Sequence, residues 1–412
     1  MAHDRLDAVL DRHVAGLREA GTAKGVEAVV TAVRPPSDGR GPRVRLRDAG
    51  EREFIRMNSN SYLGMSLREP VIEAEEKAAR RYGAGPGAVR FISGTYDPHV
   101  ELERKLAAFH DRDAAMIFSS AYASVVSALV PLTDNGTLVI SDELNHNCII
   151  NAMRLSRPQA KRIYAHNDMD ALSSALAEAA NEAPDTRARR VLIVTDGIFS
   201  MRGDNAPLAE IVELARRHDA AFSENVVVVV DDSHGVGAFG ETGRGVEERC
   251  GARADVLVAT LGKALGVNGG YVTASAAVIG YLRETSMMYI YSNPITAGEA
   301  SAAAVALDLL DSADGRSLLA RLRSLTRRFE EGLVERGFEV IAGEHPVVPL
   351  MVRDTDRTRR LVAHLRENGV LATGLTYPVV PRGDEEIRFQ INADHTEADL
   401  DQVLDVLSSF EA

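Results

Sequence analysis

Short apolar runs separated by segments of helical spacing occupy most of the chain after about residue 58. Between the runs, apolar residues recur three and four positions apart, which is typical of amphipathic helices. Strands that alternate with helices favour an α/β fold with a doubly wound, mainly parallel sheet. The predicted strands are 116–118, 138–140, 191–194, 226–230 and 256–259, and the predicted helices between them include 100–110, 122–131 and 208–218.

The two ends of the chain have different patterns. Residues 5–20 have helical spacing, a Pro/Gly stretch at 34–42 breaks the chain, and 43–57 alternates like a short hairpin. Two long helical segments, 298–312 and 316–336, precede a mixture of short strands and helices. We therefore predict an N-terminal arm at 1–57, a large ligand-binding domain at 58–299 and a smaller α+β domain at 300–412.

Composition narrows the class of protein. The 412 residues carry a net charge of −13, which argues against a nucleic-acid or anionic-membrane surface. Cys148 and Cys250 lie far apart, without metal-ligand spacing, and fit a reducing compartment. The N-terminus lacks the apolar core of a secretory signal, and no apolar run approaches the roughly 18 residues of a membrane span. We expect a cytoplasmic protein with no nucleic-acid, membrane or metal partner.

The stretch 255–271, DVLVATLGKALGVNGGY, combines an apolar run with one lysine among glycines. The run at 256–259 suits a strand that is covered on both faces. Gly262 and Gly266 flank Lys263 and would let backbone approach a ligand closely. A desolvated lysine can attack a carbonyl group, although a solvated lysine at a strand end is the simpler interpretation of this stretch alone.

Asp231 ends the apolar run 226–230 and is a second candidate for chemistry. A carboxylate buried there needs a positive partner, such as the protonated nitrogen of a pyridine ring, unless it merely caps a turn. The start of a helix at 119–122 offers free N–H groups that suit a phosphate. Lysine, carboxylate, phosphate site and an imidazole to stack on the ring together indicate pyridoxal phosphate.

A glycine pattern at 235–240, GVGAFG, matches GxGxxG but does not favour a dinucleotide. Four polar residues separate it from the preceding strand, and no apolar helix begins after it. The chain also lacks GxSxG, a Walker loop and HExxH, which disfavours a serine hydrolase, a P-loop NTPase and a zinc protease.

Seven stretches together resemble one family: NSYLG (60–64), FISGTYDPHVELE (91–103), SDELNHNCII (141–150), VTDGIFSMRGD (194–204), VVDDSHGVG (229–237), TLGKALG (260–266) and YPVVPRGDEEIRFQINADHT (377–396). As a set they resemble the α-oxoamine synthases, pyridoxal phosphate enzymes of fold type I, the aspartate-aminotransferase fold. The resemblance spans roughly residues 55–410. Its closing stretch is most similar to glycine C-acetyltransferase, also called 2-amino-3-ketobutyrate CoA ligase.

The resemblance implies a role for each matching residue around the cofactor ring. Lys263 would hold pyridoxal phosphate as a Schiff base and later move the α-proton of the substrate. Asp231 would pair with the pyridine nitrogen, and His234 would bind the ring oxygen. His146 would stack on the ring, and Ser200 would assist near the same oxygen.

The resemblance also implies how phosphate and substrate are bound. Asn60 and Arg388 would bind the carboxylate of the amino acid. Ser292 would reach the phosphate from a partner subunit, so a homodimer with a shared active site is expected. The phosphate would otherwise be held by the backbone of Ala121 and Tyr122 and the hydroxyl of Thr260.

The implied reaction condenses an amino acid with an acyl thioester. Glycine, which Val89 favours, would attack an acyl-CoA such as acetyl-CoA and give a β-keto amino acid or an α-amino ketone. Arg202, Val125 and Pro294 are among the departures from the family pattern, several of which would lie near the acyl donor. A donor bound to an acyl-carrier protein, or one otherwise unusual, therefore stays open. So does another fold-type-I activity, an aminotransferase or a decarboxylase.

Overall fold

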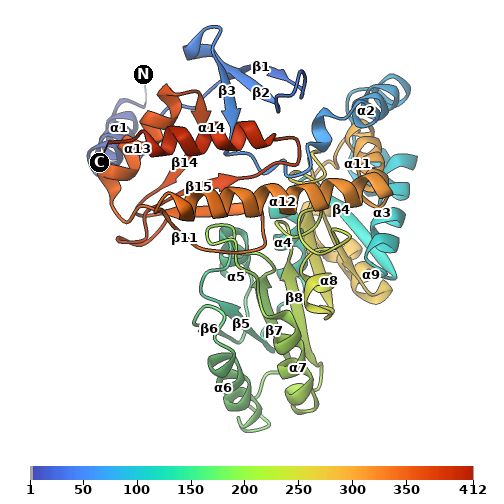
Figure 1. Ribbon diagram of the computed structural model, residues 1–412. Coiled ribbons are helices and arrows are strands. Elements are labelled where there is room, and N and C mark those ends of the chain that lie inside the picture. The colour runs from blue at the N-terminus through green and yellow to red at the C-terminus, as the bar shows by residue number, and fades with distance from the viewer. Residues whose placement is uncertain (1–2, 412) are drawn as a thin grey trace.

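A seven-stranded sheet forms the centre of the computed structural model, which describes residues 3–411 (Figure 1). The strand order is β4-β10-β9-β8-β7-β5-β6, and only β10 runs antiparallel to its neighbours. The α/β class predicted from the alternation is confirmed. The strands are β4 (Ala114–Phe118), β5 (Thr137–Asp142), β6 (Ala160–Tyr164), β7 (Arg190–Asp196), β8 (Val226–Asp231), β9 (Val256–Thr260) and β10 (Gly270–Ala274).

Helices cover both faces of this sheet. Alternate residues of one strand enter different cores, so that Leu192 packs with residues of α4 and α5 while Ile193 packs with residues of α6 and α7. None of the helices within residues 3–411 has the length and apolar character needed to cross a bilayer. The helices are α2 (Glu69–Tyr82), α3 (Asp97–Phe109), α4 (Ala121–Leu129), α5 (Asn147–Leu155), α6 (Met169–Ala180), α7 (Leu208–His218), α8 (Val246–Cys250), α9 (Ala276–Thr285), α10 (Met287–Ile290) and α11 (Ala297–Leu310).

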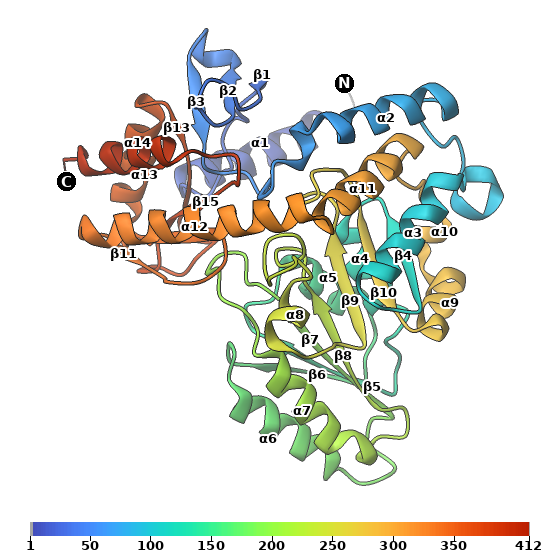
Figure 2. The same cartoon turned by 45° about the vertical axis from the view of Figure 1, so that its right-hand side comes forward.

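The C-terminal part is built on a second, antiparallel sheet with the order β11-β12-β15-β14. Figures 1 and 2 show the long helix α12 running from the α11 end of the molecule to the end that carries α13 and α14. The elements are α12 (Ala313–Glu335), β11 (Glu339–Val340), β12 (Val347–Met351), α13 (Thr355–Glu367), β13 (Val370–Leu371), β14 (Thr373–Leu375), β15 (Glu386–Gln390) and α14 (Glu397–Ser408).

The N-terminal segment is attached to this C-terminal part. Strand β13 pairs in parallel with β3 and extends the sheet to β1-β2-β3-β13. The Met57 carbonyl accepts from the Gln390 N–H at 2.8 Å, and Arg43 forms an ion pair with Asp399 at 2.5 Å. Helix α1 buries none of its residues in this chain. The elements are α1 (Asp4–Glu19), β1 (Val30–Arg34), β2 (Arg43–Leu46) and β3 (Glu53–Arg56).

Two strands of the large sheet were not predicted from the sequence. β6 is an edge strand that contains the consecutive basic residues Lys161 and Arg162, so no apolar run marks it. β10 begins at Gly270, directly after the glycines that follow Lys263, and its pattern merges with that loop. Its antiparallel insertion between β4 and β9 brings Gly270 opposite Thr260.

A buried ion pair joins α3 to the edge of the large sheet. Glu103 Oε1 accepts from Arg90 Nη1 at 3.0 Å and from the Ile117 N–H of β4 at 3.1 Å. Glu103 Oε2 accepts from Arg90 Nη2 at 3.1 Å and from Arg283 Nη2 of α9 at 2.8 Å. One carboxylate thus satisfies two guanidinium groups and one backbone N–H.

Replacing Glu103 by Ala should lower the free energy of unfolding by about 3–5 kcal/mol, because it leaves the buried Arg90 without its partner. Urea unfolding followed by circular dichroism measures the change. Glu101→Ala is the matched control on the same helix: its ion pair with Arg104 is exposed, and a change of about 0–1 kcal/mol is expected. Equal effects in the two variants would contradict a structural role for the buried pair.

Candidate active site

Four neighbouring parallel strands, β5, β7, β8 and β9, end at the same edge of the large sheet and border one pocket. Ligands of open α/β sheets bind at this carboxyl edge. The structure brings most of the predicted site residues together there. The lining includes Ala121, Tyr122, His146, Ser200, Asp231, His234 and Lys263, together with Cys148, Asp196, Ile198 and Ser233.

Asp231, the last residue of β8, is buried, and its two carboxylate oxygens have different partners. Oδ1 accepts from the Ser233 N–H at 3.1 Å and from the Ser233 hydroxyl at 2.5 Å. Oδ2 faces the Cys148 thiol at 3.6 Å, which is a weak donor. The Oδ2 side therefore keeps capacity to accept a stronger hydrogen bond from a ligand.

Asp196 lies beside Asp231 because β7 and β8 pair them in register. Burial and the neighbouring Asp231 raise the pKa of Asp196 well above its usual value. Asp196 Oδ2 accepts from the His146 N–H at 2.9 Å, which fixes the start of α5. Desolvation lowers the pKa of His146, so its imidazole is neutral, and the residue lines the pocket.

Lys263 follows β9 and shares the pocket with both carboxylates. Desolvation lowers the pKa of Lys263 to about 8, although Asp231 and Asp196 favour its charged form. A neutral amine is therefore available at only slightly alkaline pH. This is the protonation state that attacks a carbonyl group.

His234 is held from two sides by buried aromatic groups. Its Nδ1 is 2.8 Å from the Tyr62 hydroxyl, which donates to Asn60 Oδ1 at 3.3 Å. His345 Nε2 donates to the His234 carbonyl at 2.9 Å. Desolvation lowers the pKa of His234 well below its usual value, so the imidazole is neutral. Asn60 is thereby linked to His234 through the Tyr62 hydroxyl, although it is not part of the pocket lining.

The N-terminus of α4 faces the pocket with Ala121 and Tyr122. Ser120 caps the helix by accepting from the Ala123 N–H at 3.1 Å, and the preceding N–H groups have no partner within the helix. A Cβ at Gly270 would lie 2.3 Å from the Ala121 nitrogen, so glycine is required for this close approach. The result is a cradle of backbone donors that suits a phosphate.

Within one chain, neither Thr260 nor Ser292 is part of the described lining of this pocket. The Thr260 hydroxyl accepts from the Gly262 N–H at 3.0 Å and donates to the Gly269 carbonyl at 3.2 Å, so it is engaged with its own loop. Ser292 lies between α10 and α11 and is not part of the lining of this pocket in the described chain.

Arg388 on β15, in the C-terminal part, is not in the pocket lining but contacts Ser200, which is. Its Nη1 donates to the Ser200 carbonyl at 2.8 Å. With its amide oxygen turned toward Arg388, Gln390 accepts from Nε at 2.6 Å and from Nη2 at 2.9 Å. Of the five N–H groups of a guanidinium, three are used in this way and two remain for a ligand.

A second cavity of about 400 Å³ adjoins the pocket and shares His146 and Ser200 with it. The loops after β5 and β7 form one wall, and the segment 379–386 with β12 forms the other. This cavity lies where a second substrate could approach the same reacting centre.

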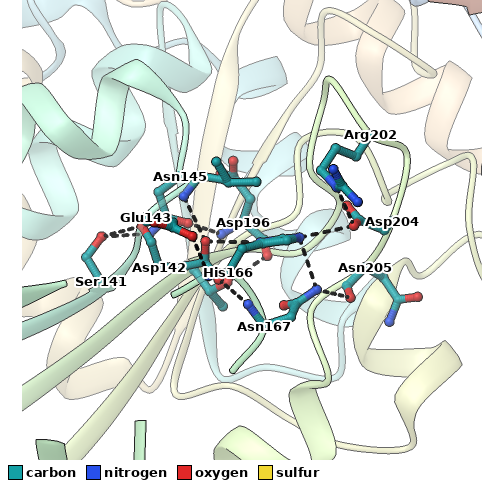
Figure 3. A network of polar contacts seen from close by, with 12 residues as sticks. Ser141, Asp142, Glu143, Asn145, His166, Asn167, Asp196, Arg202, Asp204 and Asn205 are labelled. Atoms are coloured by element: carbon teal, nitrogen blue, oxygen red, sulfur yellow. Dashed lines mark hydrogen bonds and ion pairs between the residues drawn. The ribbon is translucent and has the colours of Figure 1, made fainter. Parts of the chain in front are cut away.

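A charged network holds these two loops together (Figure 3). His166 Nδ1 donates to Asp142 Oδ1 at 3.2 Å, and Nε2 donates to Asp204 Oδ2 at 3.0 Å. Arg202 Nε donates to the same Asp204 oxygen at 3.0 Å. Desolvation opposes a charge on His166, but the two carboxylates outweigh it and raise its pKa to about 9. The resulting imidazolium ties the loop that carries His146 to the loop that carries Ser200.

Comparison with known proteins agrees with this geometry. The family model "Aminotransferase class I and II" matches residues 52–407. The 8-amino-7-oxononanoate synthase of Symbiobacterium thermophilum is 40% identical over 397 residues, covering 94% of each chain. The one from Fervidobacterium nodosum is 39% identical over 358 residues, covering 86% of this chain and 87% of the relative.

Solved structures give the same result. Serine palmitoyltransferase from Sphingomonas wittichii has a TM-score of 0.86 and 25% identity and covers 99% of this chain and 97% of its own. A structure of SPT with a PLP internal aldimine has a TM-score of 0.86 and 26% identity, with the same coverage. The chain belongs to the α-oxoamine synthase branch of the aminotransferase class I and II family.

Pyridoxal phosphate is the cofactor of this family, and the residues of the synthase fit it. The glycine-dependent cradle at α4 matches a phosphate, and the open side of Asp231 Oδ2 matches a protonated pyridine nitrogen. Lys263 lies in the same pocket with a lowered pKa. The cofactor predicted from the sequence is therefore confirmed. The roles assigned to single residues remain predictions.

Sequence reasoning missed several groups that shape this site. Tyr62 and His345 hold His234 but come from segments far from it in the chain. Ser233 follows Asp231 by two residues, and a serine so close to a strand-end carboxylate can be predicted to donate a hydrogen bond to it. No local pattern identifies His166, because its partners lie on other loops.

Replacing His166 by Asn should lower the free energy of unfolding at pH 7 by about 1–3 kcal/mol, because two charge-assisted hydrogen bonds are lost. The pKa of His166 is raised from 6.5 to about 9, so its contribution is complete below pH 6.5 and is lost as the pH rises through 9. Urea unfolding of parent and variant between pH 6 and 10 measures this. A difference that does not change with pH would attribute the effect to packing of the ring on Phe199.

Proposed function

We propose that this α-oxoamine synthase joins a small amino acid, glycine in the first instance, to an acyl group delivered as a thioester. The thiol, such as coenzyme A, is released. The observation that carries the proposal is the presence of Lys263 and Asp231 in one pocket that adjoins a second cavity of about 400 Å³. The product would be a β-keto amino acid, or an α-amino ketone where the carboxylate leaves as carbon dioxide.

The residues around the α-carbon would bind and orient the cofactor and the amino acid, and would move the α-proton. When bound, pyridoxal phosphate supplies an electron-withdrawing ring that makes the α-carbon acidic. Lys263 Nζ would take the α-proton and return it, and its pKa of about 8 supports this task near neutral pH. Asp231 would accept a hydrogen bond from the ring nitrogen, and the neutral His146 would lie against the ring face. His234, with Ser200 nearby, would hydrogen-bond the ring oxygen.

The carboxylate of the amino acid would be bound by Arg388. Its two remaining N–H groups can hold both carboxylate oxygens, and Asn60 is linked to His234 through the Tyr62 hydroxyl. Phosphate binding would use Ala121 and Tyr122. We keep the prediction that the partner subunit's Ser292 completes this site in a homodimer, with Thr260 contributing its hydroxyl.

A second candidate function comes from the relatives. Their name, 8-amino-7-oxononanoate synthase, denotes a product with an amine beside a ketone and a carboxylate at the far end of the chain. For this chain it would require an acyl donor that ends in a carboxylate. Acetyl transfer to glycine is the other specific proposal, and it would leave most of the second cavity unfilled.

Release of coenzyme A tests the proposed function. The holoenzyme is given glycine, alanine or serine with acyl-CoA thioesters of increasing length, and the free thiol and the mass of the product are measured. Release that requires both substrates is expected. Turnover of an amino acid with a 2-oxo acid, or loss of carbon dioxide without any thioester, would instead indicate an aminotransferase or a decarboxylase.

Replacing Lys263 by Ala should lower kcat by about 10²–10⁴-fold, the usual contribution of a positioned general acid–base group. Borohydride reduction of the parent, followed by peptide mapping, should place the pyridoxyl group on Lys263, and the variant should carry none. Lys105→Ala is the matched control, because Lys105 forms an ion pair with Asp308 away from the pocket. Equal labelling of the parent and the Lys263 variant would rule out this attachment site.

A further inference from the structure

The second cavity is lined by an ionisable residue whose side chain has no role in the fold or in the binding of the cofactor. Glu386, the first residue of β15, lines the cavity two positions before Arg388. Residues two apart on a strand point to the same face, so Glu386 lies on the same face of β15 as Arg388, which donates to the Ser200 carbonyl. Glu386 belongs to the stretch 377–396 that carries part of the family resemblance, but the resemblance implies no role for it.

The Glu386 carboxyl group is buried without compensation. The residue is 3% exposed, and its Oε1 is enclosed with no hydrogen-bond partner among the described residues. Burial raises the pKa of Glu386 to about 7, although Arg388 and Arg202 favour its charged form. An unpaired buried carboxyl is unfavourable unless a ligand provides a donor.

Most of the other charged residues that line the cavity have the same sign as Glu386. Among the described residues of the lining, Glu143 and Asp384 are acidic and Arg202 is basic. Arg202 Nε is already engaged by Asp204 at 3.0 Å. A chain that ended in a carboxylate would therefore enter a cavity with an excess of negative charge.

The rest of the lining suits an aliphatic chain. Apolar side chains come from both walls of the cavity, and a volume of about 400 Å³ is within the usual range for small-molecule sites. The apolar part of the lining includes Leu144, Met201, Ile341, Met351, Val379 and Val380. An apolar channel with one buried, unpartnered carboxyl is a site for a chain that carries a hydrogen-bond donor.

We propose that Glu386 selects acyl thioesters whose acyl chain carries a hydrogen-bond donor, an amine or a hydroxyl group, and rejects those that end in a carboxylate. The inference rests on the proposed function, because it names the acyl donor of the same site. With this preference, the synthase would differ in its acyl donor from an enzyme whose product ends in a carboxylate.

Binding of matched six-carbon thioesters to the holoenzyme tests the proposal. Calorimetric titration, without amino acid, compares 6-aminohexanoyl-, 6-hydroxyhexanoyl-, hexanoyl- and adipoyl-CoA. The amine should bind at least about tenfold more tightly than adipoyl-CoA, the effect of one hydrogen bond to a charged group. Equal affinities, or tighter binding of adipoyl-CoA, would overturn the proposal.

Two variants locate the selectivity. Glu386→Gln keeps the shape of the side chain and should reduce the amine-to-adipoyl ratio to within about threefold. Asp384→Asn is the matched control: Asp384 also lines the cavity but is half exposed and screened by solvent, so the ratio should fall much less than in Glu386→Gln. An unchanged ratio in Glu386→Gln, or a loss of the ratio in Asp384→Asn, would overturn the assignment to Glu386. Thermal unfolding at pH 8 checks that Glu386→Gln is folded, and it should be no less stable than the parent, because burial disfavours the charged form of Glu386 at that pH.

Adding the amino acid afterwards separates the two proposals. If the enzyme discriminates among the thioesters but releases no coenzyme A with glycine, alanine or serine, the proposed acyl transfer is wrong and the role of Glu386 stands. If it releases coenzyme A but binds all the thioesters equally, the acyl transfer stands and the role of Glu386 is wrong.

Discussion

The site depends on two carboxyl groups that are buried side by side at the ends of adjacent parallel strands. The other residues of the site have to provide the hydrogen bonds and the positive charge that these groups need. The pairing of β7 with β8 sets Asp196 beside Asp231, and burial together with this neighbour raises the pKa of Asp196 well above its usual value. The His146 N–H satisfies Asp196, whose raised pKa favours its neutral form. Asp231 is left as the acceptor for a cation, and Lys263 and a protonated pyridine are the two that the pocket can hold.

The sequence predicts those parts of the site that follow directly from a strand. The apolar runs 226–230 and 256–259 end just before Asp231 and Lys263, and parallel strands bring such ends together. Tyr62 and His345 could not be predicted in this way, because their contacts with His234 depend on how distant segments pack. Strand β6 escaped detection because an edge strand needs no continuous apolar run.

The family motifs line both cavities of the site. Motif residues such as Asp231 and Lys263 line the cofactor pocket. The lining of the second cavity also comes mostly from motif stretches, 141–150, 194–204 and 377–396, with Ile341 and Met351 outside them. The stretch 377–396 resembles glycine C-acetyltransferase, yet it lies in a chain similar to 8-amino-7-oxononanoate synthases. The likeness of the motifs therefore identifies the chemistry and does not by itself identify the acyl group.

The attachment of β3 to β13 has a consequence for biosynthesis on the ribosome. Ile55 pairs with Val370, and the Tyr62 carbonyl accepts from the Ala393 N–H, so the first strands to be translated find their neighbours among the last. Contacts of such long sequence separation form late and slowly. Asn60 and Tyr62 belong to this junction, and the nascent chain therefore cannot complete the surroundings of His234 until its C-terminal strands have emerged.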